Sequence, residues 1–131
     1  MSETELYNVL IVEATRLGHR LFRNSVGRAR YRSAKTGDVF TVPYGVGGVG
    51  GSDLIGWTVI RYEYWLHDEN DNPTPKTIIT SCKFTAIEVK RPGKKPTAEQ
   101  LKFLEAVRAA GGLAGVVTSL ADYHELIGHR E

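Results

Sequence analysis

Two long segments of β-forming residues, separated by an evident turn, occupy the middle of the chain and limit the folds open to it. Residues 54–65 are rich in Ile, Val, Trp and Tyr, and residues 77–89 form a second run of the same kind. Between them lies the turn-like sequence Asp68-Glu69-Asn70-Asp71-Asn72-Pro73. We therefore expect residues 54–65 to form one or two strands and residues 77–89 to pair with them as a hairpin.

Helical patterns flank this hairpin on both sides. Apolar residues recur at helical spacing over about residues 4–17, and Gly18 should end that helix. Thr97-Ala98-Glu99-Gln100 is a capping box that begins a second helix, which should end at Gly111. The remaining segments, in chain order, are a short strand (19–24), a polar basic loop (25–36), a short strand (39–43), a loop with five glycines (45–51), a buried strand (113–117) and a final helix (120–127).

The chain length and composition are those of one ordinary globular domain. We expect residues 1–131 to form a single α/β domain with a mixed sheet flanked by helices, in the order α-β-β-β-α-β-α. No apolar run is long enough to span a bilayer, and the acidic N-terminus does not resemble a signal peptide. The single cysteine, Cys82, is expected to be a buried, inert thiol in a reducing compartment. These features predict a cytoplasmic protein with no membrane partner.

Basic residues are unevenly distributed, although the formal net charge is only +2. Residues 15–37 contain no acid, and they include Arg16, Arg20, Arg23, Arg28, Arg30, Arg32 and Lys35. A second cluster consists of Lys90, Arg91, Lys94 and Lys95. Such a run is often only a solvated face, but arginine suits bidentate contacts with phosphate. The distribution favours a phosphate-rich partner.

The segment Ile87-Glu88-Val89-Lys90 places a carboxylate and an ammonium group at the end of a predicted strand. Strand alternation puts Glu88 and Lys90 on one face, which Ala86 shares, while Ile87 and Val89 pack in the core. A surface ion pair would give the same tripeptide, so this segment alone does not establish a catalytic site.

Asp53 follows a glycine-rich turn and begins an apolar strand. It could serve only as a turn residue, and the glycines do not match a nucleotide-binding loop, because no GxxxxGK[ST] lysine and no helix follow them. Two carboxylates on adjacent strand ends can, however, hold a hard cation such as Mg²⁺ through oxygen ligands. A lysine beside them can orient water and stabilise the charge of a phosphorane. Asp53, Glu88 and Lys90 together thus have the chemistry needed to hydrolyse a phosphodiester.

Asp53 followed by Glu88-x-Lys90 is similar to the signature of the PD-(D/E)xK nuclease superfamily, and the wider pattern resembles its VRR-NUC (virus-type replication-repair nuclease) family. The matching motifs are Leu21-Phe22-Arg23-Asn24-Ser25-Val26-Gly27, Tyr44-Gly45, Gly51-Ser52-Asp53-Leu54-Ile55-Gly56, Ala86-Ile87-Glu88-Val89-Lys90-Arg91-Pro92-Gly93, Thr97-Ala98-Glu99-Gln100 and Ala110-Gly111-Gly112. The resemblance covers about residues 5–122, with Ser52 in place of the proline that names the superfamily. It implies a restriction-endonuclease-like core.

The resemblance also implies roles for individual residues. Asp53, Glu88 and the backbone carbonyl of Val89 would bind Mg²⁺ or Mn²⁺, and Lys90 would be the catalytic lysine. Gln100 stands where the family has a glutamine facing the site, although it could serve only the capping box, or both functions.

The family further places a glutamate of the first helix near the metal. Glu5 is our choice, with Glu3 and Glu13 as alternatives that the helical period does not separate.

The resemblance and the basic clusters together predict the residues that contact DNA: Arg23, Asn24, Arg28, Arg30, Arg32, Arg91, Lys94 and Lys95. For Arg23 the alternative is an exposed surface arginine. The four histidines have no ligand spacing and are assigned no metal. The aromatic residues Trp57, Tyr62, Tyr64 and Trp65 are expected to pack in a sheet or a subunit interface rather than to stack on bases.

The predicted function is that of a Mg²⁺-dependent, structure-selective DNA endonuclease that resolves branched DNA in replication, recombination or repair. Stand-alone members of the family look like homodimers that act on four-way junctions, which implies a homodimer here. The alternatives are a flap or nicking nuclease with weak structure preference, and a DNA-binding module of the same fold without catalysis.

Overall fold

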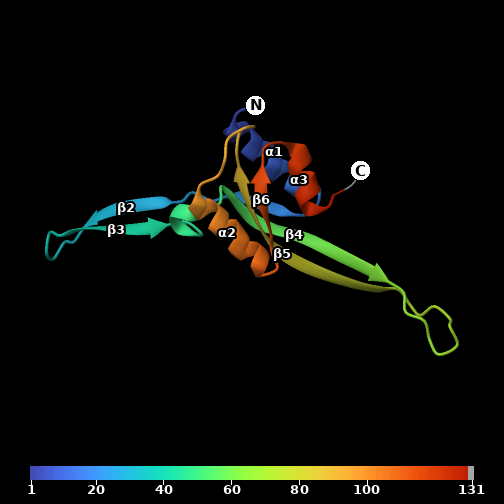
Figure 1. The fold of residues 1–131 in the computed structure, drawn as a ribbon. Coiled ribbons are helices and arrows are strands. Elements are labelled where there is room, and N and C mark those ends of the chain that lie inside the picture. The colour runs from blue at the N-terminus through green and yellow to red at the C-terminus, as the bar shows by residue number, and fades with distance from the viewer. Residues whose placement is uncertain (130–131) are drawn as a thin grey trace.

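A four-stranded mixed sheet in the order β1-β4-β5-β6 forms the centre of the molecule. The computed structural model describes residues 1–129, so Arg130 and Glu131 of the expected domain lie outside the described residues. The strands are β1 (Arg20–Arg23), β4 (Leu54–Tyr64), β5 (Thr77–Val89) and β6 (Leu113–Val117). The pairs β1–β4 and β4–β5 are antiparallel, whereas β5–β6 is parallel. Residues 54–64 thus form one continuous strand, and the predicted hairpin is confirmed (Figure 1).

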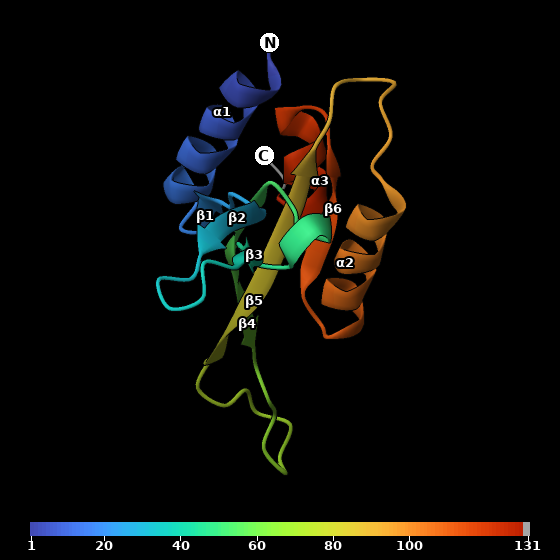
Figure 2. The same ribbon diagram turned by 90° about the vertical axis from the view of Figure 1, so that its left-hand side faces the viewer.

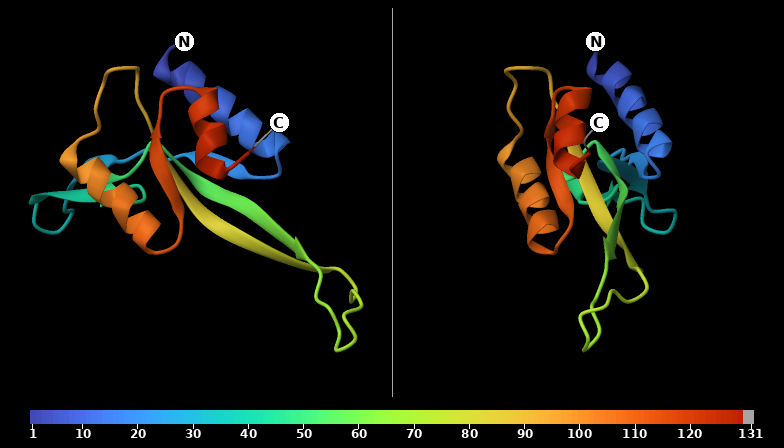
Figure 3. Two further views of the ribbon diagram at one scale, coloured as in Figure 1. Left: turned by 45° about the vertical axis from the view of Figure 1, so that its right-hand side comes forward. Right: turned by 90° about the vertical axis from the view of Figure 1, so that its right-hand side faces the viewer.

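Helices cover both faces of this sheet (Figure 3). Helices α1 (Glu3–Arg16) and α3 (Leu120–Ile127) pack on one face, and α2 (Ala98–Ala109) packs on the other. The order of the elements that build this core is the expected α-β-β-β-α-β-α, and the α/β fold class is confirmed.

Strand alternation divides β5 between the two faces. Ile87 and Val89 are buried against α1 and α3, whereas Ala86 is buried with Leu104 of α2. Glu88 lies on the α2 side and is buried among these apolar residues. The predicted partition of this segment is therefore correct.

Local capping interactions determine where the helices begin. The Ser2 side chain accepts from the Glu5 backbone N–H at the start of α1. Thr97 and Gln100 form the predicted capping box of α2, and the Ser119 side chain caps α3.

Residues 25–36 are not the loop that we expected. Strand β2 (Gly27–Arg32) pairs antiparallel with β3 (Val39–Tyr44), and the two form a separate ribbon that extends away from the sheet (Figures 1 and 2). Most of its side chains are exposed. Arg28, Arg30 and Arg32 do alternate with Ala29 and Tyr31, but this period is short, and the polar, basic composition of residues 25–36 obscured it. A 3₁₀ turn, η1 (Gly48–Gly50), follows β3 within the predicted glycine-rich loop.

The distal half of the β4–β5 hairpin also projects beyond the helices (Figure 3). Cys82 lies on this half and is exposed, so the expectation of a buried thiol is wrong. The prediction that Cys82 lies in a strand is correct, but it borders an open hollow beside the end of α2 and is not covered by that helix. Within residues 1–129, no helix is long and apolar enough to cross a membrane.

Candidate active site

Asp53 and Glu88 come together because their strands run antiparallel. Leu54 pairs with Ile87, so Asp53, the residue before β4, lies beside the last residues of β5. The Asp53 Oδ2 atom accepts a hydrogen bond of 2.8 Å from the Val89 backbone N–H. The two predicted carboxylates are therefore neighbours at one end of the sheet.

Glu88 is not part of a surface ion pair, since only 1% of it is exposed. Its Oε1 accepts a hydrogen bond of 2.9 Å from Gln100 Nε2 and lies 3.6 Å from Lys90 Nζ. Its Oε2 is buried and has no hydrogen-bond partner. A buried carboxylate oxygen without a donor is costly unless a cation or a proton satisfies it.

The pKa of Glu88 also indicates that its carboxylate needs a cation or a proton. Burial, followed by the neighbouring Asp53 carboxylate, raises the pKa of Glu88 to about 8, and the Lys90 ammonium only partly offsets this. Two adjacent carboxylates that repel each other in a buried place are stabilised in the charged form by a bound cation.

These donors fit a hard divalent ion. Within residues 1–129, no group of three or more His, Cys, Asp or Glu side chains gathers around one point. Two carboxylates would therefore need a backbone carbonyl and water to complete the coordination, and Mg²⁺ usually keeps several waters. Asp53, Glu88 and the Val89 carbonyl are the residues that could hold it.

The sequence left open whether Gln100 serves the capping box or the site, and the structure shows that it contacts both. Its Oε1 accepts from the Thr97 backbone N–H at 2.8 Å, while its Nε2 donates to Glu88. One amide thus closes the capping box of α2 and links that helix to the carboxylate site.

The three candidate glutamates of α1 have different surroundings. Glu5, our first choice, is exposed, and the contacts of its side chain do not include Asp53 or Glu88. Glu13 bonds to Arg16 and His124 near the far end of the helix. Glu3 lies one helical turn before Tyr7, and its charge helps to raise the Tyr7 pKa. Of the three, Glu3 is thus the glutamate whose charge acts on Tyr7, the neighbour of Asp53.

Tyr7 is a site residue that the sequence analysis missed. Burial and the Asp53 carboxylate, with which the hydroxyl forms a hydrogen bond, raise the pKa of Tyr7 to about 12. The Arg23 guanidinium lies over the Tyr7 ring, 4.7 Å from its centroid. Tyr7 is buried on α1 with Leu6 and Leu10, and no sequence motif marks it as a site residue. Its spacing of four residues from Glu3 was the one available signal.

Asn24 holds the loop before Asp53 through hydrogen bonds within the protein. Its Nδ2 donates to the carbonyls of Val46 and Ser52 at 2.8 and 3.0 Å, and its Oδ1 accepts from the Val46 N–H. The Asn24 backbone N–H also donates to the Asp53 carbonyl at 2.8 Å. Both amide protons are used within the protein, so Asn24 positions the loop that leads into Asp53.

The other predicted DNA-contacting residues are exposed. Arg91, Lys94 and Lys95 lie in the loop that follows β5, directly after Lys90. Arg28, Arg30 and Arg32 lie on β2, and Arg23 ends β1 beside Asn24. The described residues therefore place basic side chains on chain segments next to both carboxylates.

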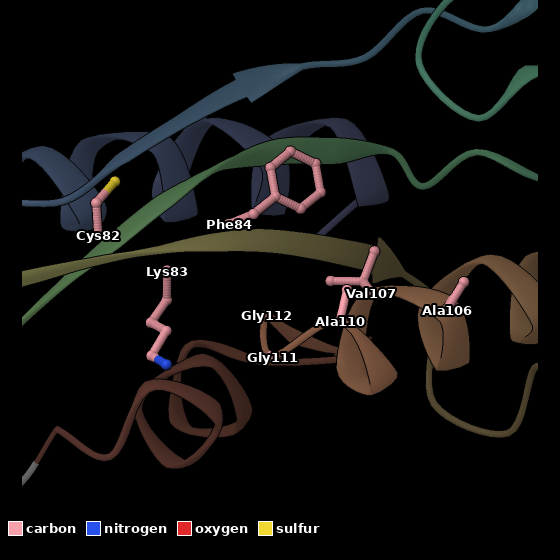
Figure 4. Close-up of a pocket in the computed structure, with 8 residues that line it drawn as sticks. All are labelled: Cys82, Lys83, Phe84, Ala106, Val107, Ala110, Gly111 and Gly112. Atoms are coloured by element: carbon pink, nitrogen blue, oxygen red, sulfur yellow. The ribbon is translucent and has the colours of Figure 1, made fainter.

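One hollow of the surface lies away from these carboxylates. It is lined by the middle of β5, including Lys83 and Phe84, and by the end of α2 at Val107 (Figure 4). It contains no carboxylate, and Glu88 is further along β5. This hollow does not have the groups of a phosphodiester-cleaving site.

Comparison with known proteins assigns the chain to a family. The sequence model of the VRR-NUC domain matches residues 11–121, a range that contains Asp53, Glu88, Lys90 and Gln100. No curated protein and no solved structure matches the chain. The match covers most of the sequence, and it agrees with the resemblance carried by the motifs. The chain belongs to the VRR-NUC family, and its domain is of the nuclease type.

Proposed function

We propose that this protein is a Mg²⁺- or Mn²⁺-dependent endonuclease that hydrolyses phosphodiester bonds in branched DNA, with four-way junctions as the main substrate. The observation that carries the proposal is the paired Asp53 and Glu88 carboxylates, with the buried Glu88 Oε2 unsatisfied and Lys90 beside them. Burial of two adjacent carboxylates costs free energy that a bound cation offsets, which favours a metal-dependent activity over a non-catalytic module.

Each residue of the candidate site has a separate role in this proposal. Asp53, Glu88 and the Val89 carbonyl would hold the metal ion, which when bound supplies Lewis acidity at the phosphate and at a coordinated water. Lys90 Nζ, whose side chain is only 20% exposed, would orient the attacking water by a hydrogen bond and stabilise the negative charge on the phosphoryl oxygens. Gln100 holds the Glu88 carboxylate in place from α2.

The basic residues bind the DNA backbone in this proposal. Arg91, Lys94 and Lys95 contact phosphates on the Lys90 side of the site, and Arg23 does so on the Asp53 side. Phosphate contacts fix the position of the duplex but do not read its sequence. Selection of substrates by structure is consistent with such a surface.

A homodimer is part of the proposal. The distal hairpin exposes apolar side chains that one protomer leaves uncovered, among them Tyr62, Trp65 and Ile79. A two-fold axis at this surface would direct two sites at opposed strands of a junction.

Cleavage assays with three labelled substrates test this function. A four-way junction, a flap and a linear duplex are incubated with Mg²⁺, with Mn²⁺ or with EDTA. We expect paired nicks in the junction, little cleavage of linear DNA and none in EDTA. Glu88→Gln and Asp53→Asn should abolish cleavage while DNA binding persists, whereas Glu105→Gln, an exposed carboxylate of α2, serves as the matched control.

Other results would favour the alternatives. Cleavage of the flap in preference to the junction, or single nicks in every substrate, would indicate a flap or nicking nuclease. Binding without cleavage under all metal conditions would indicate a DNA-binding module.

A further inference from the structure

The β2–β3 ribbon has two chemically different faces. Alternation along β2 puts Arg28, Arg30 and Arg32 on one face. The Cα atoms of successive arginines in this set are about 7 Å apart. All three are exposed, and within residues 1–129 none of them forms an ion pair. Arg32 donates to the Gly37 carbonyl at the ribbon's own turn. We call this the arginine face.

The opposite face is aromatic. Tyr31 and Phe40 are cross-strand partners, and their rings stack with centroids 5.7 Å apart. Tyr31 is 52% and Phe40 48% exposed, although the two rings cover each other. Tyr44 lies on the same face nearer the root of the ribbon, opposite Gly27, and is 48% exposed. We call this the aromatic face.

The ribbon is anchored to the candidate active site rather than tethered by a free loop. Asn24, at its root, bonds to Val46 on the returning segment and to the backbone of Ser52 and Asp53. Figures 1 and 2 show the ribbon extending from this root away from the sheet. Its position relative to Asp53 is thus defined by hydrogen bonds.

We propose that the ribbon is a wedge for branched nucleic acid: the aromatic face stacks on a base pair exposed at the branch point, and the arginine face binds phosphates of the adjoining arm. A nucleic acid accounts for both faces at once, since it offers anionic phosphates and flat bases within a few ångströms of each other. An isolated two-stranded ribbon is only marginally stable, which favours a bound state for this one.

This inference rests on the proposed function. It explains how the nuclease would distinguish branched DNA from linear DNA. A continuous duplex presents phosphates along its length, but its base-pair faces are covered by stacking. A branch interrupts the stacking and uncovers such a face. The arginine face therefore binds branched and linear DNA alike, whereas the aromatic face has a partner only at the branch.

The test compares two double variants in binding assays carried out in EDTA. The substrates are a four-way junction and a linear duplex whose ends are closed by loops, so that no base-pair face is free. Tyr31→Ser/Phe40→Ser should lower junction affinity about tenfold or more and leave the affinity for the closed duplex unchanged. Arg28→Ser/Arg30→Ser should weaken both, and it should reduce the slope of log K against log salt by about 2.

A fluorescent base reports the stacking directly. With 2-aminopurine next to the branch point, wild-type protein should change the emission, and Tyr31→Ser/Phe40→Ser should remove that change. Tyr31→Phe/Phe40→Tyr keeps both rings and should restore it, which separates stacking from a folding defect. Val12→Ser, at an exposed apolar residue of α1, is the control for loss of apolar surface.

Three results with Tyr31→Ser/Phe40→Ser would overturn the wedge. The variant could lose junction and closed-duplex affinity equally, it could change the 2-aminopurine emission as wild type does, or its mass in solution could be half that of wild type. The last would mean that a second copy of the chain covers the aromatic face. If wild-type protein stacks at the branch but cuts no substrate with Mg²⁺ or Mn²⁺, the proposed activity fails and the wedge stands.

Discussion

At the residue scale, the candidate site combines side chains that the sequence places together with others that only the fold brings in. Glu88 and Lys90 share a strand face because they are two residues apart, so strand alternation alone predicts their proximity. Asp53 reaches them through the antiparallel pairing of β4 and β5. Gln100 reaches Glu88 because the capping box turns its amide back toward the start of α2.

Gln100 allows its two roles to be separated by two variants. Gln100→Ala removes both contacts and should lower the free energy of unfolding by about 1 kcal/mol and also reduce cleavage. Gln100→Glu keeps the capping acceptor but replaces the donor to Glu88 by a carboxylate, so kcat/KM should fall although the capping contact remains. Urea unfolding and junction cleavage measure the two effects. Wild-type cleavage by Gln100→Glu would restrict this residue to the cap.

Tyr7 is expected to orient Asp53 through its hydroxyl. Tyr7→Phe keeps the ring beneath Arg23 but loses the hydrogen bond to the carboxylate, and a bond to a charged group is worth about 1.5–3 kcal/mol. We expect a tenfold or larger fall in kcat/KM and a higher Mg²⁺ concentration at half-maximal rate, with DNA affinity unchanged. Tyr7→Leu, which also loses the ring, should weaken DNA binding as well. An unaltered Mg²⁺ dependence in Tyr7→Phe would contradict this role.

Tyr7 and Asn24 also show where sequence-based reasoning ends. Asp53, Glu88, Lys90 and Gln100 could be predicted because their motifs are local in the chain. The contact of Tyr7 with Asp53 depends on how α1 packs on the sheet, and no local pattern encodes that packing. The bonds of Asn24 to Val46 and Ser52 span more than twenty residues, so the motif marked the residue but not its partners.

At the element scale, prediction succeeded where a buried face or a cap marked the sequence. The limits of α2 follow from Thr97 and Gly111, and the partition of β5 follows from its alternation. The β2–β3 ribbon was missed because its alternation covers only a few residues within a basic, polar segment and neither face packs on the core. The length of the β4–β5 hairpin was predicted, but the exposure of its distal half was not, because burial depends on which helices lie over a strand.

The pairing of α1 with α3 gives a prediction for acid stability. Hydrogen bonds from Arg16 and then His124 lower the pKa of Glu13 from its ordinary value of 4.5 to about 2. A lowered folded-state pKa contributes stability that is fully present above pH 4.5 and is lost as the pH falls from about 4.5 to about 2. Glu13→Gln should therefore lower the unfolding free energy at pH 7 and flatten its fall in this range. Urea unfolding between pH 7 and pH 2.5 measures this.

Glu125→Gln, an exposed carboxylate of α3, is the control for that experiment. It should follow the wild-type pH profile. If Glu13→Gln loses stability with acid as steeply as wild type between pH 4.5 and pH 2.5, the Glu13 ion pairs do not contribute to the acid sensitivity.

At the scale of the whole molecule, two ribbons project from one small core: β2–β3 at the end that carries Asp53, and the distal half of β4–β5 at the opposite end (Figures 1 and 3). The first combines arginines with aromatic rings and suits a nucleic acid. The second exposes apolar side chains on both faces. Tyr62 and Ile79 are directly opposite each other on one face, and both are about half exposed. The other face carries Arg61 and the Glu63–Lys76 ion pair beside Ile78, which is also about half exposed.

The Tyr62 face of the distal hairpin is our predicted contact between two copies of the chain. Exposed apolar side chains that meet across a two-fold axis gain burial on both copies, so their loss should weaken the dimer strongly. Light scattering at micromolar concentration should give twice the chain mass for wild type and the single mass for Tyr62→Ser/Ile79→Ser. Arg61→Ser, on the other face of the same strand, should remain dimeric. The monomeric variant should nick a junction once where the dimer makes paired nicks, because only the dimer carries a second site for the opposed strand. A wild-type mass equal to one chain, or a Tyr62→Ser/Ile79→Ser protein that remains dimeric, would mean that this face has another function.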